Sequence, residues 1–420
     1  MNVLVVGSGG REHAIAAKLA ASARVWCAPG NAGTARVGTN LAIAATNVEA
    51  IVRAAKDHAI DLVVVGPEAP LALGLVDALS EAGVLAFGPS KAAAALESSK
   101  GFAKDFMKRH RVPTAGYGVF DDADEAIAFV HRAGRPMVVK ADGLAAGKGV
   151  VVASSTEETV RAIEEIMIAR EHGEAGARVV VEERLEGPEV SYHVVSDGER
   201  YVALAAAQDH KRLLDGDRGP NTGGMGAYSP PPMVTEALER AILKDVVEPT
   251  LAGMASEGTP FRGALFVGVM IVDGAPMVLE YNVRFGDPET EVLMARWEGD
   301  VLPLFLGSAR GDLRGVVPRW GAPAALSVVM ASEGYPGVVA NGRVIEGLEE
   351  ANALEGVLVH EAGTVGEGGR TLTSGGRVLA VTATGADVDE AAARAYAAVA
   401  RVRFEGAQHR RDIGWQARTR

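Results

Sequence analysis

The sequence predicts a multi-domain α/β protein that begins with a doubly wound parallel sheet. The chain has 420 residues, which is more than one compact core usually holds. Roughly its first hundred residues alternate short β-branched runs with alanine-rich helical stretches, which is the pattern of βαβ units. The pattern changes near Lys100, and proline and glycine cluster at 315–323. We therefore expect a central unit and a separate C-terminal domain after the first domain.

The N-terminal region carries apolar runs that are typical of buried strands, separated by amphipathic stretches. The strands are expected at 3–6, 25–27, 62–65 and 84–87, and the helices near 12–20, 48–58 and 71–82. Each apolar run ends in a loop that contains glycine or proline. This predicts a Rossmann-like domain over residues 1–103, with ligands at the carboxyl ends of the strands.

The central region mixes short strands, helices and one polar stretch. Helices are expected at 101–110, 157–170 and 235–256, strands at 137–140, 150–152, 178–183 and 201–206, a polar glycine-rich stretch at 209–232, and a hairpin at 265–272 and 276–281. The tail from about residue 324 has short strands, a glycine-rich turn at 366–369, a strand at 377–382 and a helix at 388–399. A small α+β domain over 324–420 is predicted.

Composition and charge exclude several functional classes. The net charge of −12 argues against nucleic-acid binding, which relies on Lys and Arg. No apolar run reaches the ~18 residues that a membrane span needs. Cys27 is the only cysteine, so no internal disulfide can form, and we expect it to be a buried packing residue. With no secretory leader in the sequence, we expect a cytoplasmic protein that binds neither nucleic acid nor membrane.

A glycine loop at 7–10 follows the first expected strand and opens the first expected helix. Free backbone N–H groups and the helix dipole suit a phosphate at such a place, and Arg11 can supply a counter-charge. A dinucleotide fingerprint is incomplete here, because Glu12 stands at the third glycine position and the second strand ends without an acidic residue. We favour a monophosphate site. NAD binding and a turn needed only for packing are the alternatives.

A lysine-containing loop at 140–149 joins two expected strands. Its spacing does not match a P-loop, because Asp142 occupies the first glycine position and Gly149 replaces the Ser/Thr. Lys140 at the strand end can reach the α- or β-phosphate of a nucleotide, while loop N–H groups cover the outer phosphates. A solvated turn is the alternative interpretation.

The strand that follows ends in paired glutamates. Glu182 and Glu183 close an apolar run whose edge backbone groups could serve an adenine ring, and Glu189 could accept hydrogen bonds from ribose hydroxyls. Taken alone, the segment also fits an ordinary strand with charged ends.

The run 277–289 is the strongest local indication of chemistry. Positions i and i+2 of a strand share a face, so Glu280 and Asn282 point together as oxygen ligands for a hard cation. Arg284 continues this face and can stabilise the charge of a transferring phosphoryl group. The alternative, a solvated strand end, leaves this polar row without a purpose beside an apolar hairpin.

Read in order, several stretches resemble one family along nearly the whole chain. They lie at 7–13, 140–149, 209–226, 282–289, 373–379 and 411–414. The sequence is similar to the ATP-grasp superfamily and, within it, to the phosphoribosylamine–glycine ligase family. The long central run at 209–226 makes this resemblance specific.

The resemblance implies a fold and a reaction. The implied fold has a Rossmann-like domain at 1–103, an ATP-grasp unit at 104–312 with a small lid at about 118–190, and a C-terminal domain at 324–420. The implied reaction joins glycine to 5-phosphoribosylamine with ATP, through glycyl phosphate, in purine biosynthesis. The implied cofactor is Mg²⁺ or Mn²⁺, and a monomer is expected.

The resemblance and the local patterns together give each site residue an expected role. ATP is expected to contact Lys104, Lys140, Gly147, Lys148, Gly149, Glu182, Glu183, Leu185 and Glu189. Substrates are expected at Gly9, Gly10, Arg11, Asp209, His210, Lys211, Gly223, Gly224, Met225, Gly226, Pro288 and Glu289. Arg284, Asp287 and Lys140 are the expected catalytic residues, and Glu280 and Asn282 the metal ligands.

Some alternatives stay open on the sequence alone. Many ATP-grasp enzymes have two acidic metal ligands, whereas the preceding strand at 267–270 offers none, so few protein groups hold the metal. Another ATP-grasp ligase with a different acid or amine is one alternative. A nicotinamide oxidoreductase and a non-catalytic nucleotide sensor are the others.

Overall fold

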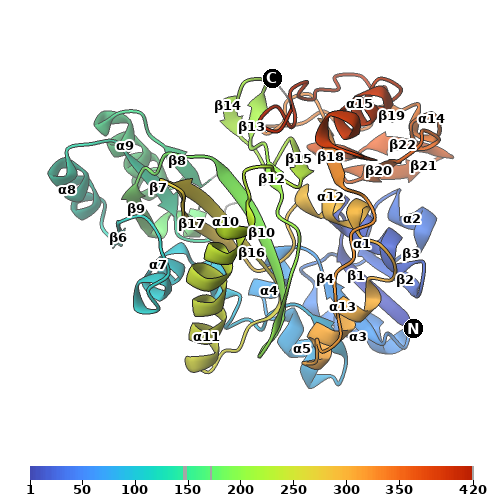
Figure 1. The fold of residues 1–420 in the computed structure, drawn as a ribbon, viewed down its shortest axis with the longest axis horizontal. Coiled ribbons are helices and arrows are strands. Elements are labelled where there is room, and N and C mark those ends of the chain that lie inside the picture. Colours follow the sequence, from blue (N-terminus) through green and yellow to red (C-terminus); the bar gives the residue numbers. More distant parts are fainter. Residues whose placement is uncertain (145–148, 171–172, 419–420) are drawn as a thin grey trace.

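The N-terminal domain is built on a five-stranded parallel sheet in the order β3-β2-β1-β4-β5 (Figure 1). The computed structural model describes residues 1–144, 149–170 and 173–418. The strands are β1 (Asn2–Gly7), β2 (Arg24–Pro29), β3 (Thr39–Asn40), β4 (Leu62–Val65) and β5 (Leu85–Phe87), and the helices are α1 (Gly10–Leu19), α2 (Thr34–Val37), α3 (Val48–Asp57), α4 (Glu68–Ala72) and α5 (Leu75–Glu81).

The predicted doubly wound sheet is confirmed, with two local differences. Strand β3 was not predicted, because its two residues are polar and show no apolar run. The helix expected at 71–82 is divided into α4 and α5 at Gly74, whose φ of 88° no helix interior accepts. Strand β4 and residues 3–6 of β1 are apolar because helices cover both faces of the sheet. Cys27 is fully buried in β2, as expected, and burial raises the pKa of its thiol to about 12.

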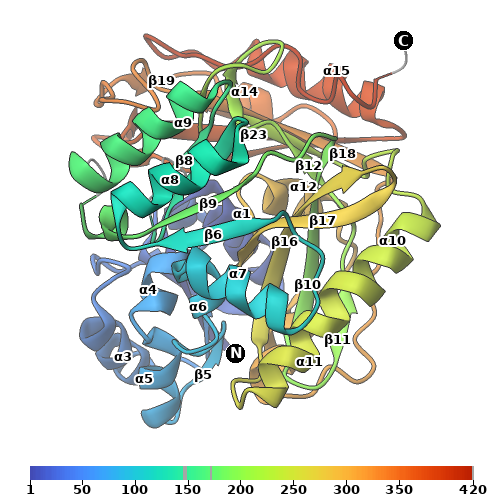
Figure 2. The same ribbon diagram turned by 90° about the vertical axis from the view of Figure 1, so that its left-hand side faces the viewer.

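A small antiparallel unit projects from the body of the molecule at the left of Figure 1 and faces the viewer in Figure 2. Its sheet has the order β6-β9-β7-β8. The elements are β6 (Tyr117–Phe120), α8 (Ala123–Ala133), β7 (Met137–Ala141), β8 (Val150–Val152), α9 (Thr156–Ile163), a π-helical turn η1 (Glu164–Ile168), a 3-10 turn η2 (Gly173–Ala177) and β9 (Val179–Glu183). Helices α8 and α9 cover the outer side of this sheet around a small apolar core that includes Val130, Val139 and Ile163. We call this unit the lid.

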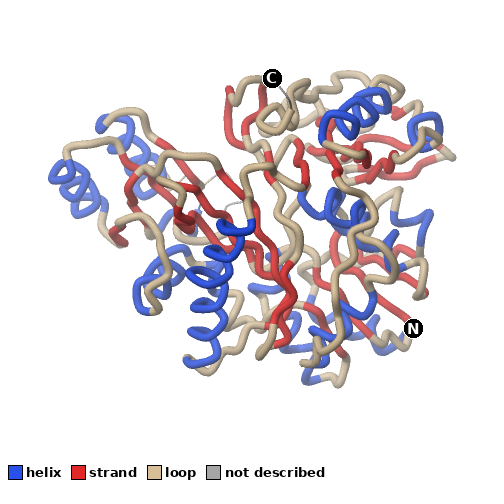
Figure 3. Tube along the Cα trace, in the orientation of Figure 1, coloured by secondary structure: helices blue, strands red, loops and turns tan. Residues whose placement is uncertain are grey.

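A central antiparallel sheet lies between the lid and the N-terminal domain, in the order β11-β10-β16-β17. Its strands are β10 (Glu189–Asp197), β11 (Tyr201–Ala203), β16 (Arg262–Val272) and β17 (Ala275–Asn282); the surrounding helices are α6 (Ala95–Ser98), α7 (Lys100–Arg109), α10 (Glu236–Ile242), α11 (Glu248–Ser256), α12 (Glu289–Arg296) and α13 (Leu302–Arg310). The long helix expected at 235–256 runs from α10 to α11 through a π-helical turn, η3 (Leu243–Val247), and is visible in Figure 3.

The two faces of the central sheet have different roles. Val190, Tyr192 and Val278 face the apolar side, which packs against α10, η3 and α11. A register shift at Gly268/Val269 of β16 accommodates the extra residue Leu279 in β17. The opposite face therefore carries Glu280 in a row with Gly268 and Ser191.

The C-terminal sheet recruits strands from the middle of the chain. Its order is β12-β15-β18-β23-β20, and a three-stranded sheet β19-β22-β21 lies beside it. The elements are β12 (Gln208–Asp209), β13 (Arg212–Leu214), β14 (Arg218–Asn221), β15 (Gly226–Ser229), β18 (Ala324–Ala331), β19 (Val344–Ile345), α14 (Leu348–Asn352), β20 (Val357–Glu361), β21 (Thr364–Glu367), β22 (Arg370–Thr373), β23 (Arg377–Gly385) and α15 (Val388–Val399). The boundary expected at 324 leaves out β12 and β15, because their pairing with β18 joins residues about a hundred positions apart.

Apolar side chains of the described residues form separate cores for the lid, the C-terminal domain and the body. None of the helices within the described ranges is both long and apolar enough to cross a membrane.

Candidate active site

Two lysines and a glutamate form a buried ion cluster between the lid and the body. Lys140 at the end of β7 and Lys104 in α7 both bind the carboxylate of Glu182 in β9. The Lys140 Nζ to Glu182 Oε1 distance is 2.6 Å, and Lys140 also donates to the Leu279 carbonyl at 2.9 Å. Burial disfavours the charge of Glu182, but the two lysines outweigh this effect and hold its pKa below the ordinary value. The cluster thus places two cations at the seam where a triphosphate is expected.

Burial lowers the pKa of Lys104 to about 8, and the neighbouring charge of Lys140 adds to the decrease while Glu182 opposes it. An ammonium group that loses its proton near pH 8 attracts the triphosphate less above that pH. We therefore expect the KM for ATP to rise between pH 7.5 and 9, and Lys104→Met to raise it at neutral pH and to remove this pH dependence. Steady-state kinetics across this pH range would measure the KM for ATP. Lys108→Met, on the exposed side of the same helix, is the control. An unchanged pH profile in Lys104→Met would exclude Lys104 as the titrating group.

The expectation that the end of β9 offers edge backbone groups is wrong. Strand β9 lies between β6 and β7, and the Glu183 N–H donates to the Gly116 carbonyl at 2.8 Å. Successive side chains of a strand point to opposite faces, so Glu182 faces the lysines while Glu183 pairs with Arg135 on the outer surface. Leu185, just beyond the strand, is half-buried.

The glycine loop after Lys140 is anchored at both of its described ends. Asp142 accepts hydrogen bonds from the Gly101 N–H and the Ser99 hydroxyl, and the Gly149 carbonyl accepts from the Ala141 N–H at 2.8 Å. Gly147 and Lys148, which were expected to cover ATP phosphates, lie outside the described residues.

Lys100 is a third cation of this region, and it was not predicted as a site residue. It occupies the first position of α7, donates to the Gly143 carbonyl at 2.9 Å and lies near Glu280. Residues four apart share a helix face, so the spacing of Lys100 and Lys104 indicates that both side chains lie on the same side of α7.

The expected metal ligands Glu280 and Asn282 share one face of β17. Burial opposes ionisation of Glu280, but Lys211, Lys140 and Lys100 outweigh it and keep its pKa low, so the group is a carboxylate. The Asn282 side chain is buried, and its Nδ2 has no hydrogen-bond partner among the described residues. Its Oδ1 accepts one hydrogen bond from Arg284 Nη2 at 3.0 Å, and an amide oxygen has a second lone pair for a cation. The Glu280 carboxylate and the Asn282 Oδ1 therefore fit a divalent cation that keeps mostly phosphate and water ligands.

Arg284 extends from the same face and is held by acids of the N-terminal domain. Its Nη2 donates to Glu97 Oε1 and Asn282 Oδ1, each at 3.0 Å, and its Nε lies 3.3 Å from Glu68 Oε2. Glu97 also accepts the Val283 N–H at 2.7 Å. Neither glutamate was predicted, although Glu68 begins α4 just after the carboxyl end of β4, where ligands of such sheets gather.

A group of acids surrounds Lys211 next to Glu280. Lys211 Nζ donates to Glu189 Oε2 at 2.6 Å, and Asp209 lies close by. Glu289, at the start of α12, is buried and accepts a hydrogen bond from the Ser191 hydroxyl at 2.8 Å. Burial raises the pKa of Asp209 to about 8; Lys211 opposes this shift, and Glu289 adds to it. The group therefore offers carboxyl groups to a cationic substrate.

The segment 209–226 folds back on itself rather than lying open. His210 is buried, and its Nε2 contacts Gln416 and the Gly414 N–H, so its side chain is turned toward the C-terminal segment. Met225 is also fully buried. Gly224 has a φ of 113°, and a Cβ there would lie 2.6 Å from Pro288 Cδ, so only glycine allows this close approach. The loop at 223–226 thus meets the Asp287–Pro288 segment through its backbone.

The glycine loop of the N-terminal domain reaches the same place from the other side. Gly9 caps α1, and the Arg11 N–H lies 3.4 Å from Asp287 Oδ2. The Arg11 guanidinium is turned inward: Nε binds Glu12 at 2.5 Å, and Nη1 donates to the Phe285 carbonyl at 2.9 Å. With only 6% of its surface exposed, Arg11 serves as an internal counter-ion. The geometry favours backbone groups, not this side chain, as the contact to an anion.

A cleft of about 300 Å³ opens between the N-terminal and C-terminal domains beside Asp287. Its lining comprises Ser8, Gly9, Gly30, Asn31, Asp287, Ala362, Gly363, Thr364, Ser374 and Arg377. Of these, only Gly9 and Asp287 were predicted as site residues. Asn31 could have been predicted, because it lies in the loop after β2, and β2 is the neighbour of β1 in the parallel sheet. Arg377 is brought to the cleft only by the tertiary fold.

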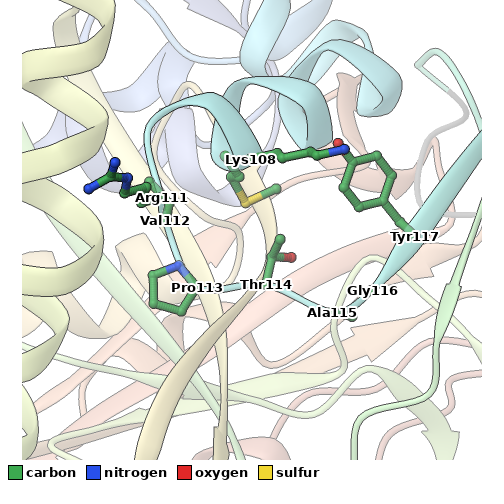
Figure 4. Close-up of a pocket in the computed structure, with 9 residues that line it drawn as sticks. Lys108, Arg111, Val112, Pro113, Thr114, Ala115, Gly116 and Tyr117 are labelled. Atoms are coloured by element: carbon green, nitrogen blue, oxygen red, sulfur yellow. The ribbon is translucent and has the colours of Figure 1, made fainter.

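Another hollow, of about 450 Å³, lies on the link between α7 and β6 (Figure 4). Lys108, Arg111, Pro113, Thr114 and Tyr117 are among its lining residues. None of the predicted site residues lines it. Its Thr114 nevertheless accepts a hydrogen bond from Lys104 at 2.6 Å and donates to the Val278 carbonyl at 2.7 Å, which ties the link to the site.

Family models of phosphoribosylglycinamide synthetase match the chain in consecutive segments. The N domain model matches residues 1–97, the ATP-grasp (A) domain model residues 98–290 and the C domain model residues 325–416.

Full-length relatives carry one name. A phosphoribosylamine–glycine ligase of Vibrio vulnificus is 50% identical over 423 residues, covering 99% of this chain and 98% of the relative. The corresponding ligase of Rhizobium meliloti is 51% identical over 420 residues, with 99% of each chain covered.

Solved structures agree with this relationship. The crystal structure of phosphoribosylamine–glycine ligase from Thermotoga maritima has a TM-score of 0.87 and 37% identity, covering 99% of this chain and 100% of the other. The biotin carboxylase domain of Hydrogenobacter thermophilus 2-oxoglutarate carboxylase, at 18% identity, has a TM-score of 0.73 with 97% and 91% covered, which shows a shared fold alone. These matches to a ligase family contradict the alternatives of a nicotinamide oxidoreductase and a non-catalytic nucleotide sensor. The chain belongs to the phosphoribosylglycinamide synthetase family and is an ATP-grasp ligase.

Proposed function

We propose that this site ligates glycine to 5-phosphoribosylamine with ATP, giving glycinamide ribonucleotide, ADP and phosphate in purine biosynthesis. The observation that carries the proposal is the position of Asp287. It lies between the charged face of Glu280, Asn282 and Arg284 and the cleft of the N- and C-terminal domains. A nucleotide site and a sugar-phosphate site would therefore meet at this residue. The family and its full-length relatives support the same activity.

ATP would lie between the lid and the central sheet. Lys104 and Lys140 would exchange part of their contact with Glu182 for the phosphates, and Leu185 would pack against the adenosine. The protein has little covalent chemistry to perform in phosphoryl transfer, so positioning and charge stabilisation dominate.

Glu280 and Asn282 would hold Mg²⁺ or Mn²⁺ with ATP. The bound metal would neutralise charge on the phosphates. The contribution of the chain is to keep Glu280 ionised through the nearby lysines and to orient Asn282 by the hydrogen bond from Arg284.

The first step activates glycine. A carboxylate oxygen of glycine attacks the γ-phosphorus, the bond to the β,γ-bridging oxygen breaks, and ADP leaves with that electron pair. Arg284 lies where it can stabilise charge on the transferring group. The acids Asp209 and Glu289 would receive the ammonium group of glycine.

The second step forms the amide. The nitrogen of phosphoribosylamine attacks the acyl carbon of glycyl phosphate, and phosphate leaves with the electron pair of the broken C–O bond. The nitrogen loses one proton in this step, and the departing phosphate takes it up and leaves as hydrogen phosphate. Asp287 is the nearest carboxylate to the cleft; burial acts to raise its pKa, but Arg377 and Arg11 outweigh this effect and lower it. It would orient the amine as a hydrogen-bond acceptor.

Substrate-dependent phosphate release tests the proposal. With Mg²⁺ and ATP, we expect release only when glycine and phosphoribosylamine are both present, and glycinamide ribonucleotide should appear in equal amount. A strong preference for another acid–amine pair would show a different ATP-grasp ligase. Sedimentation would test the monomer that the sequence predicts.

A further inference from the structure

Arg377 is the only arginine side chain that lines the cleft of about 300 Å³ within the described residues. It begins β23, and its Nη1 is saturated by the carbonyls of Gly223 and Asp287, each at 2.7 Å, and by Asp287 Oδ1 at 3.2 Å. Its Nε and Nη2 have no hydrogen-bond acceptor in residues 1–144, 149–170 and 173–418. The side chain is 23% exposed. One edge of the guanidinium is thus fixed by the protein, and the other remains available.

The other walls of the cleft supply neutral donors. Ser8 and Ser374 line it, and neither of their hydroxyls makes a hydrogen bond within the described ranges. Asn31 holds the opposite wall in place, because its Nδ2 donates to the Ser8 carbonyl at 2.9 Å and to the Glu361 carbonyl at 2.6 Å. Asp287 is the one carboxylate among the lining residues, and Arg377 already neutralises it.

We propose that Arg377 binds the 5′-phosphate of phosphoribosylamine through Nε and Nη2, together with the hydroxyls of Ser8 and Ser374. This assignment rests on the proposed function, which supplies the sugar phosphate. A guanidinium edge binds two oxygens of a phosphate in parallel, and such charge-assisted hydrogen bonds are strong. The cleft volume lies at the small end of ligand sites, which suits a sugar phosphate. Arg11 is unsuitable for this role, because Glu12 and Phe285 already bind its buried guanidinium.

The same side chain would connect the phosphate to the reaction centre. Nη1 of Arg377 holds the carbonyl and carboxylate of Asp287 and the carbonyl of Gly223. A phosphate on the other edge would fix the guanidinium plane, and with it the position of Asp287 beside the amine. Arg377 is therefore both a phosphate-binding and a positioning residue.

A comparison of two ligands isolates the phosphate contact. Calorimetry on the full chain would compare glycinamide ribonucleotide with glycinamide riboside, which lacks the phosphate. We expect Arg377→Met to weaken ribonucleotide binding by about 10- to 100-fold, the range for hydrogen bonds to charged groups, and to leave riboside binding nearly unchanged. Arg377→Lys should show an intermediate loss, because its Nζ can replace Nη1 at the carbonyls but cannot supply the second edge. Arg343→Met, which removes an arginine paired with Glu405 elsewhere in the C-terminal domain, is the control and should leave the affinity ratio unchanged.

The outcomes separate the inference from the proposed function. If Arg377→Lys weakens the binding of both ligands equally, Arg377 only supports the fold. If the ratio of ribonucleotide affinity to riboside affinity is unchanged in both variants, Arg377 is not part of the phosphate site. If Arg377→Met does not fold, the Arg377→Lys ratio decides. A wild-type chain that forms no glycinamide ribonucleotide would overturn the proposed function itself.

Discussion

Replacing Glu280 with glutamine is expected to lower turnover by about 10²-fold or more, by analogy with the loss of one charge-stabilising group in other enzymes. The change keeps the shape of the side chain and removes its charge. A neutral amide would then lie among Lys211, Lys140 and Lys100. Of the two predicted metal ligands, a divalent cation would lose the one that carries a charge. The apparent activation constant for Mg²⁺ should rise along with the fall in kcat. Phosphate release at increasing metal concentration measures both quantities.

A second Glu→Gln variant serves as the matched control. Glu239 in α10 accepts a hydrogen bond from the Tyr192 hydroxyl at 2.7 Å, and Tyr192 lies on the opposite face of β10 from the site. Glu239→Gln should therefore retain near-normal kcat. If Glu280→Gln also retains it at saturating metal, Glu280 does not hold the metal.

Arg284→Met is expected to lower kcat by about 10²- to 10³-fold, because the transferring phosphoryl group loses a preorganised cation. It should also lower the free energy of unfolding by about 1–3 kcal/mol, because Glu97 and Glu68 lose their partner while they remain largely buried. Burial already raises the pKa of Glu97, although Arg284 opposes that increase. Steady-state kinetics and denaturant unfolding measure the two effects separately.

A double variant distinguishes the catalytic role of Arg284 from its structural role. Glu97→Gln in the Arg284→Met background removes one unpaired carboxylate and should restore part of the lost stability. Turnover should stay low, because no cation returns to the site. Recovery of kcat in parallel with stability would show that Arg284 acts only by holding the domains together.

The sequence by itself determined the elements that depend on local pattern. The apolar runs of β1, β2, β4 and β5 identified the parallel sheet, because strands covered on both faces are apolar throughout. The i, i+2 spacing placed Glu280 and Asn282 on one face, since the extra residue Leu279 precedes both and the pairing from Glu280 to Asn282 is regular. The succession of motifs indicated the family.

Only the tertiary structure decided which side chains meet across domains. Arg11 was expected to face a phosphate. Its guanidinium is instead turned inward, because it donates hydrogen bonds to the buried Glu12 carboxylate and to the Phe285 carbonyl. Glu183 is turned to Arg135 because β9 is paired on both sides. Strands β12 and β15 join the C-terminal sheet, Glu68 and Glu97 bind Arg284, and Arg377 enters the cleft. Apart from the pair Arg11–Glu12, these contacts join residues far apart in the chain, and the periodicity of a sequence carries no information about such pairs until the cores of the domains bring them together.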